Sequence, residues 1–177
     1  FMDGGIFWRD KIRFIINTCR VAEFEHRYSD RFFREPDQPF YRYTKDPRNN
    51  SIRVVEMLDA FLEDEPAIDE YTQYYTQLGQ GLKVHPLVSY GSHSVNHYVL
   101  SSLSEDQQWC EIDENYRFLE TLPGVYRTRV FSVPFGGNWD YNDATSRLVA
   151  DAGHSAMLLS RGAVQRNDAC HDGLLPM

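Results

Sequence analysis

The chain has 177 residues, of which 42% are hydrophobic and 14% aromatic, and its formal net charge is −8. This composition suits a folded domain with one sizeable core and excludes a disordered chain. The acidic balance argues against nucleic acid as a partner, and no apolar run reaches the roughly 20 residues of a membrane span. The three cysteines form no CxxC pair, so neither a disulfide framework nor a cysteine zinc ribbon is predicted. We see no signal peptide and expect a soluble protein, whose compartment stays open.

The first half of the chain is predicted to be helical, with one long irregular segment. Apolar residues at helical spacing predict a helix over residues 7–24. Residues 27–50 are rich in charge, aromatics and proline, and we expect an irregular insertion there. It is either a binding loop or a solvated connector whose aromatic side chains pack inward. Ser51 is placed to cap a helix through residue 63, and Pro66 to begin a short helix over residues 67–78.

The second half alternates between strands and helices. In chain order we predict a strand at 87–90, a helix behind a capping box at 104–107, a strand at 126–133, a helix from Asp143 and a strand at 155–160. This alternation predicts an α/β fold in which parallel strands are joined by helical crossovers, as a layer or a barrel. Sites in such folds lie at the carboxyl ends of the strands.

A pair of histidines follows the first of these strands. His93 and His97 are four residues apart in Gly-Ser-His-Ser-Val-Asn-His, so both side chains can project from one turn, whose shape Ser94 is placed to fix. Converging imidazole nitrogens suit a zinc-like ion. Because the chain has six histidines, such a pair also arises by chance, and that alternative stays open.

A sharp turn follows the next strand. The sequence Phe131-Ser132-Val133-Pro134-Phe135-Gly136 ends a strand in Pro-aromatic-Gly, which can direct backbone N–H groups into a site. Such donors stabilise an oxyanion. Proline and glycine also end many strands for structural reasons alone, so this motif has two interpretations.

Together these motifs resemble the polysaccharide deacetylase family, carbohydrate esterases that remove acetyl groups from chitin and peptidoglycan. Gly91–His97 is similar to the family's His-Ser/Thr-x-x-His motif, and Leu103–Asp106 to the Leu-Ser step and acidic helix behind it. Phe131–Gly136 resembles a Phe-x-x-Pro-Phe-Gly variant of the next motif, and Leu148–Leu158 continues the match. The resemblance covers residues 87–159, under half of the chain.

The resemblance implies a metal site. His93 and His97 would be ligands of a divalent metal, zinc first, that polarises the acetamide carbonyl of an N-acetylated glycan and lowers the pKa of its bound water. The backbone N–H of Phe135 would hold the tetrahedral oxyanion. Asp3, in Phe1-Met2-Asp3-Gly4, stands where the family's Thr-Phe-Asp-Asp-Gly motif places a third ligand.

The chain also departs from the family pattern. Met2 replaces the catalytic base beside Asp3, and residues 7–11 resemble a later segment of the family. This favours a register in which the first strand, with both aspartates, precedes Phe1. The third ligand would then come from another acid, and the sequence offers Asp140, Asp143 and Asp172.

Three further positions differ from the family. Ser132 stands where the family has arginine. His171 lies near the place in the chain where the family has its late general acid, but it is expected to be exposed in a polar loop. His154 is expected to pack in the core.

These observations predict one polysaccharide deacetylase-like domain over residues 1–177, a partial or distorted (β/α) barrel that lacks its first strand. Its exposed sheet edges would need cover from a homo-oligomer or another partner. One function is metal-dependent deacetylation. The alternative is a non-catalytic domain that binds a glycan or a protein, with the aromatics of residues 27–50 stacking on sugars. A third possibility is another α/β protein in which the histidine pair is a coincidence.

Overall fold

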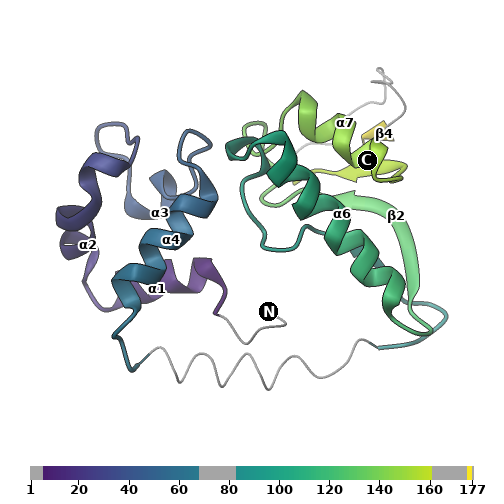
Figure 1. Ribbon diagram of the computed structural model, residues 1–177, viewed down its shortest axis with the longest axis horizontal. Helices are drawn as coiled ribbons and strands as arrows, with labels where there is room; N and C mark the ends of the chain where they lie inside the picture. The colour runs from purple at the N-terminus through teal and green to yellow at the C-terminus, as the bar shows by residue number, and fades with distance from the viewer. Residues whose placement is uncertain (1–5, 68–82, 161–174, 177) are drawn as a thin grey trace. The chain divides into compact units, whose positions relative to one another are not determined.

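A computed structural model describes residues 6–67, 83–160 and 175–176 (Figure 1). The contacts of the chain separate into two compact units, Phe1–Gly81 and Leu82–Met177. We describe the helical unit and the sheet unit in turn. No helix within the described ranges is long and apolar enough to span a membrane.

The helical unit begins with two helices where the sequence predicted one. Helix α1 spans Trp8–Asn17 and α2 spans Val21–Tyr28. Between them Cys19 adopts a φ of 58°, in the left-handed region that does not continue an α-helix. The Thr18 hydroxyl donates to the carbonyl of Phe14 at 2.8 Å and so closes the last turn of α1. The single helix over residues 7–24 was therefore wrong, because no glycine signals this break in the sequence.

Three further short elements lie in the described part of the helical unit. The 3₁₀ helix η1 spans Ser29–Arg31, α3 spans Phe40–Tyr43 and α4 spans Ser51–Leu62. The predicted α4 helix is confirmed, but its cap is Asn50, whose side chain accepts from the Arg53 N–H, and not Ser51. The helix predicted over residues 67–78 lies almost entirely outside the described residues.

An aromatic cluster forms the core of the helical unit. Phe24 is fully buried, and its ring lies 4.9–5.8 Å from the ring centroids of Tyr28, Phe32, Phe40 and Phe61. Aromatic pairs at these separations add to the free energy of simple burial. The cluster joins α2, α3 and α4 through side chains from each.

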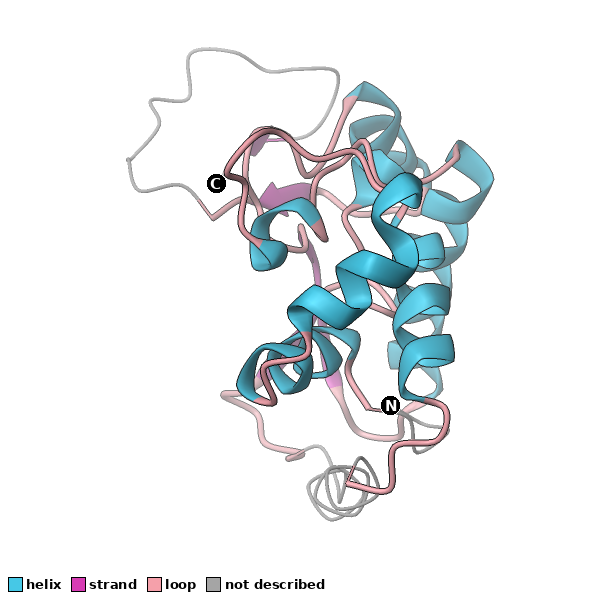
Figure 2. Ribbon diagram, turned by 90° about the vertical axis from the view of Figure 1, so that its left-hand side faces the viewer, coloured by secondary structure: helices cyan, strands magenta, loops and turns pink. Residues whose placement is uncertain are grey.

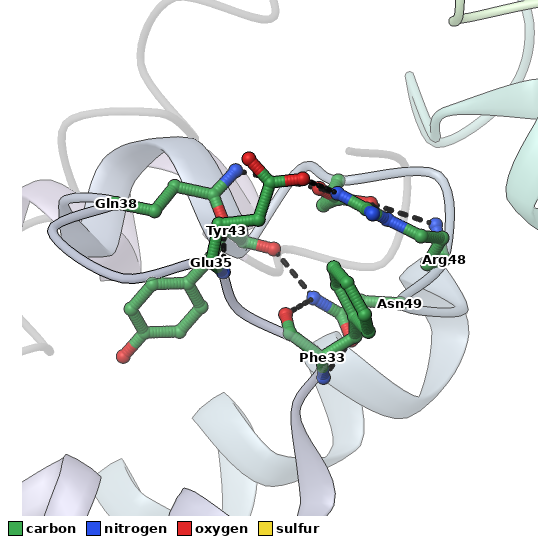
Figure 3. A network of polar contacts seen from close by, with 7 residues as sticks. Phe33, Glu35, Gln38, Tyr43, Arg48 and Asn49 are labelled. Carbon is green, nitrogen blue, oxygen red and sulfur yellow. Dashed lines mark hydrogen bonds and ion pairs between the residues drawn. The ribbon is translucent and has the colours of Figure 1, made fainter.

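Polar contacts order the segment at residues 27–50 (Figure 3). Asn49 binds both backbone groups of Phe33, each at 2.7 Å, and also donates to the Tyr43 carbonyl. Arg48 pairs with Asp46 and Glu35, and its guanidinium lies 3.6 Å over the Phe33 ring. Hydrogen bonds from Arg48 lower the pKa of Asp46. The aromatic residues of this segment are thus engaged within the unit, with Tyr43 fully buried beneath the loop.

Among the described residues, the sheet unit has four parallel strands in the order β1-β2-β3-β4, coloured magenta in Figure 2. They are β1 at Ser89–Ser92, β2 at Tyr126–Ser132, β3 at Ala156–Leu158 and β4 at Leu175–Pro176. The 3₁₀ helix η2 (Leu100–Ser102) and α6 (Glu105–Thr121) connect β1 to β2, and α7 (Asp143–Asp151) connects β2 to β3. The predicted α/β class with helical crossovers is confirmed.

The described strands form a small open sheet and do not close into a barrel. Strand β1 begins two residues later than predicted, because its pairing with β2 starts at Ser89 and leaves Leu87 89% exposed. In the described residues β1 and β4 are the two edges, and cover by a homo-oligomer stays a prediction.

The helix caps of the sheet unit follow the local sequence. The capping box of Ser104 and Gln107 is confirmed at the start of α6. Asn142 and Thr145 form a second capping box at the start of α7. Gly153 follows α7 with a φ of 92°, the left-handed conformation for which glycine is favoured at the C′ position of a helix. The core between helices and sheet includes Ile112, Phe131 and Val149, all fully buried.

Candidate metal centre

The two sequence motifs meet at the carboxyl ends of β1 and β2. The histidine turn follows β1 and the Pro-Phe-Gly turn follows β2, and the two strands pair in parallel with Ser92 opposite Phe131. The carboxyl ends of parallel strands lie at the same end of the sheet, so both turns lie there together.

His93 has a defined ring orientation. Its Nδ1 lies 2.7 Å from the backbone carbonyl of Ser132, across the β1–β2 pair. A carbonyl can only accept, so Nδ1 carries a proton and donates it, which leaves Nε2 as the nitrogen whose lone pair can bind a metal. The same arrangement orients metal-binding histidines in general.

His97 faces His93 on a tightly bent turn. The two ring centroids lie 4.7 Å apart with an interplanar angle of 80°. Ser94 and His97 both adopt left-handed backbone conformations, with φ of 63° and 57°. The His97 N–H donates to the Ser94 hydroxyl at 2.9 Å. Such backbone conformations are costly for residues other than glycine and are held only by surrounding structure.

Two side chains of α6 hold this turn, and the sequence did not single them out. The Glu111 carboxylate accepts from the backbone N–H of Asn96 at 2.8 Å and from its side-chain amide at 2.6 Å. The side-chain oxygen Oδ1 of Asn115 accepts from the Ser92 hydroxyl at 2.7 Å and from the His93 backbone N–H at 3.0 Å. Their spacing of four residues on one helix was the only local signal.

Burial sets the charge behaviour of Glu111. Its side chain is only 6% exposed, and burial raises the pKa of this carboxyl. Hydrogen bonds from Asn96, Ser94 and Val95 act in the opposite direction and favour the charged form. The carboxylate is therefore a buried acceptor dedicated to the histidine turn.

Phe135 closes the other side of His97. The ring centroids lie 4.6 Å apart at 81°, an edge-to-face contact. Phe135 and Gly136 have φ of 63° and 68°, and a side-chain carbon on Gly136 would collide with the backbone of Ser160. The Pro-Phe-Gly turn thus needs glycine at residue 136, and it places an aromatic wall beside the histidines.

Comparison with known proteins identifies the segment that carries this arrangement. The family model for polysaccharide deacetylases matches residues 67–157, just over half of the chain. The chain belongs to the polysaccharide deacetylase family. No match was found among curated proteins or among solved structures. His93, His97, Glu111 and Phe135 of this deacetylase-family chain all lie within the matched segment, whereas α1 to α4 lie outside it.

The remaining candidate residues divide into those described and those not. Asp3, Asp172 and His171 lie outside the described residues. Asp140 accepts from the Gly137 N–H at 2.7 Å and stabilises the turn after β2. Asp143 is exposed in the first turn of α7. Neither is drawn into a cluster with the histidines.

His154 lies in the interior of the deacetylase-family sheet unit. It is 4% exposed, and its ring packs 4.3 Å from Tyr116 and 5.5 Å from Phe131. Burial, with a smaller contribution from Arg129 and Arg127, lowers the pKa of His154 to about 4. It is therefore a neutral core residue at physiological pH.

The two clustered histidines fit part of a metal site. The orientation of His93 by a backbone carbonyl and the facing ring of His97 are compatible with two imidazole ligands of zinc. Within residues 6–67, 83–160 and 175–176, however, no group of three or more His, Cys, Asp or Glu side chains is placed to hold a metal ion. A third protein ligand would have to come from the rest of the protein.

Proposed function

We propose that this chain belongs to a metal-dependent hydrolase that removes N-acetyl groups from a polysaccharide. The observation that carries the proposal is the cluster of His93, His97 and Phe135 at the carboxyl ends of β1 and β2, inside the segment that matches the deacetylase family. When bound, a zinc-type ion would polarise the acetamide carbonyl and lower the pKa of a water molecule.

The chain's own residues have distinct roles in this proposal. His93 and His97 bind the metal, with the Ser132 carbonyl fixing the tautomer of His93. Glu111 and Asn115 are positioning residues, because they accept hydrogen bonds from the backbone of the histidine turn. The N–H of Phe135 donates to the oxyanion, and its ring excludes water from one side of His97.

The third ligand and the base complete the proposal. Asp3 is one candidate for the third ligand and another acid is the alternative, with the base on a residue yet to be identified. In this proposal residues 1–177 form one domain whose open sheet is part of a (β/α) barrel, and a homo-oligomer covers the exposed edges of that sheet.

The small number of metal ligands favours a second, non-catalytic function. The described residues supply two histidines without a carboxylate, and Ser132 stands at the family's arginine position. Two ligands make a weak site. The alternative is therefore a non-catalytic deacetylase-like domain that binds a glycan or a protein. The guanidinium of Arg48 covers one face of the Phe33 ring, so a sugar that stacks on that face would have to displace it.

The test is release of acetate from an N-acetylated oligosaccharide, with zinc or cobalt added and with a chelator. We expect release with metal and at least a hundredfold loss in His93→Ala. His26→Ala is the matched control, since it removes an exposed histidine of α2 outside the family match. Asp3→Asn tests in the same assay whether Asp3 is the third ligand.

The outcomes separate the two functions. Zinc binding that His93→Ala abolishes, without acetate release, would favour the non-catalytic domain. Equal zinc affinity in wild type, His93→Ala and His97→Ala would contradict metal binding by the histidine pair under either function. Full release from Asp3→Asn would move the third ligand to another acid.

A further inference from the structure

A second candidate site lies in the helical unit, outside the segment that matches the deacetylase family. A cavity of about 360 Å³ lies between α2 with η1 on one side and α4 on the other. Its size is at the lower end of the range for small-molecule pockets. The lining residues are Arg27, Tyr28, Arg31, Glu56, Met57 and Ala60.

The two arginines of the cavity are not held in ion pairs by the described residues. Arg27 and Arg31 lie 5.2 Å and 5.9 Å from the centre of the Tyr28 ring, and neither forms an ion pair with any described carboxylate. Arg42 likewise forms no ion pair with a described carboxylate, whereas other arginines of the unit do. Arg20, Arg34 and Arg48 are each paired with at least one glutamate. The guanidinium groups at the cavity therefore retain donors for an external anion.

Tyr28 gives the cavity a rigid wall. The residue is 5% exposed, and its ring packs against Phe24 in the aromatic core. Its hydroxyl has no hydrogen-bond partner among the described residues. Buried hydroxyls in folded proteins are normally satisfied by protein, water or ligand, so this group is a donor and acceptor that the described residues leave unused.

The remaining lining residues restrict the ligand. Met57 and Ala60 present apolar atoms, which suit a carbon skeleton. Glu56 is exposed at the cavity and adds one negative charge. A doubly charged phosphate would be repelled by this carboxylate, whereas hydroxyl or ammonium donors would bind to it.

We propose that this cavity binds a small carboxylate that also carries hydrogen-bond donors, such as a sugar acid. The carboxylate pairs with Arg27 and Arg31, whose planar guanidinium groups match its geometry. The ligand's hydroxyls donate to Glu56, and its carbon skeleton lies against Met57. The site is independent of the histidine cluster, since all its residues lie in the helical unit.

The experiment is calorimetric titration of the full chain with glucuronate at low salt, with a chelator present to suppress metal binding. We expect saturable binding with a Kd on the order of 1 mM, a value typical of a small exposed site. Arg27→Gln and Arg31→Gln should each weaken it about tenfold. Arg42→Gln removes an exposed arginine of α3 that does not line the cavity, and it should leave the affinity unchanged.

Further ligands and variants make the test specific. Glucose, which has the hydroxyls without the carboxylate, should not bind, and inorganic phosphate should bind more weakly than glucuronate. Glu56→Gln should reverse that last preference. His93→Ala should retain wild-type binding, which separates this site from the proposed deacetylase centre. The proposal is overturned by the absence of saturation, by equal affinity in the arginine variants and Arg42→Gln, or by tighter binding of phosphate than glucuronate in the wild type.

Discussion

The helical unit and the sheet unit achieve order by different means. In the helical unit, aromatic rings pack around Phe24, and arginine–carboxylate pairs hold the long loop at residues 33–49. In the sheet unit, several residues at the ends of β1 and β2 adopt left-handed backbone conformations around the histidines, and buried polar side chains fix them.

The difference shows where each unit can tolerate change. Removing side-chain volume from a packed aromatic core lowers the stability of the fold. Removing a hydrogen bond from a strained turn first changes the conformation of that turn. The sheet unit thus holds its candidate site by hydrogen bonds to a bent turn. The helical unit is held by a packed aromatic core and has a cavity on its surface. Three changes test this contrast.

The largest effect is expected in the aromatic core. Phe24→Ala should lower the free energy of unfolding by about 3–5 kcal/mol, because it leaves a cavity among four aromatic rings. Urea unfolding followed by circular dichroism measures this loss. Phe33→Ala, at a site 44% exposed, is the control and should cost much less. Similar losses in the two variants would contradict a core centred on Phe24.

The second effect concerns pH and the sheet unit. His154 has a pKa of about 4 in the folded chain, below its ordinary value of 6.5. The unfolded chain therefore binds more protons between these values, so stability is full above pH 6.5 and falls as the pH is lowered toward 4. The loss amounts to at most about 3 kcal/mol.

His154→Phe should remove this part of the pH dependence, since phenylalanine fills the same space without a titrating group. The measurement is the free energy of unfolding from urea titrations at several pH values between 4 and 7. His85→Gln, which removes an exposed histidine of the same unit, is the control. If wild type and His154→Phe lose stability in parallel over this range, His154 is not the buried neutral group that the structure describes.

The smallest of the three effects is on the geometry of the histidine turn. Glu111→Gln places an amide opposite the donors of Asn96, which removes at least one hydrogen bond without changing size. Supporting residues of this kind contribute about 10–100-fold to metal affinity, so we expect zinc to bind more weakly by that factor.

Zinc titration of Glu111→Gln is compared with that of Glu114→Gln, which changes an exposed glutamate on the same helix. Equal zinc affinity in these two variants would mean that Glu111 stabilises α6 without positioning the histidines. In that case the contrast between a hydrogen-bonded site and a packed scaffold would be weakened.

Local chemistry allowed much of the sheet unit to be predicted. The Ser104 cap, the glycine after α7 and the alternation of strands and helices all act within a few residues, so they can be read from the sequence. The two histidines were also predicted to project together, because four residues of one turn separate them. The helix break at Cys19 was missed, since that residue is not one that typically adopts a left-handed conformation.

The sequence by itself thus determined the family, the parallel α/β class and the pair of histidines. Only the tertiary structure decided how that pair is held. The Ser132 carbonyl reaches His93 across two strands, and Glu111 and Asn115 reach the turn from a helix 15–23 residues further along the chain. It also brought Arg27 and Arg31 to the same cavity as Glu56. Hydrogen bonds and charges that join distant segments depend on the packing of whole elements, and no local pattern encodes that packing.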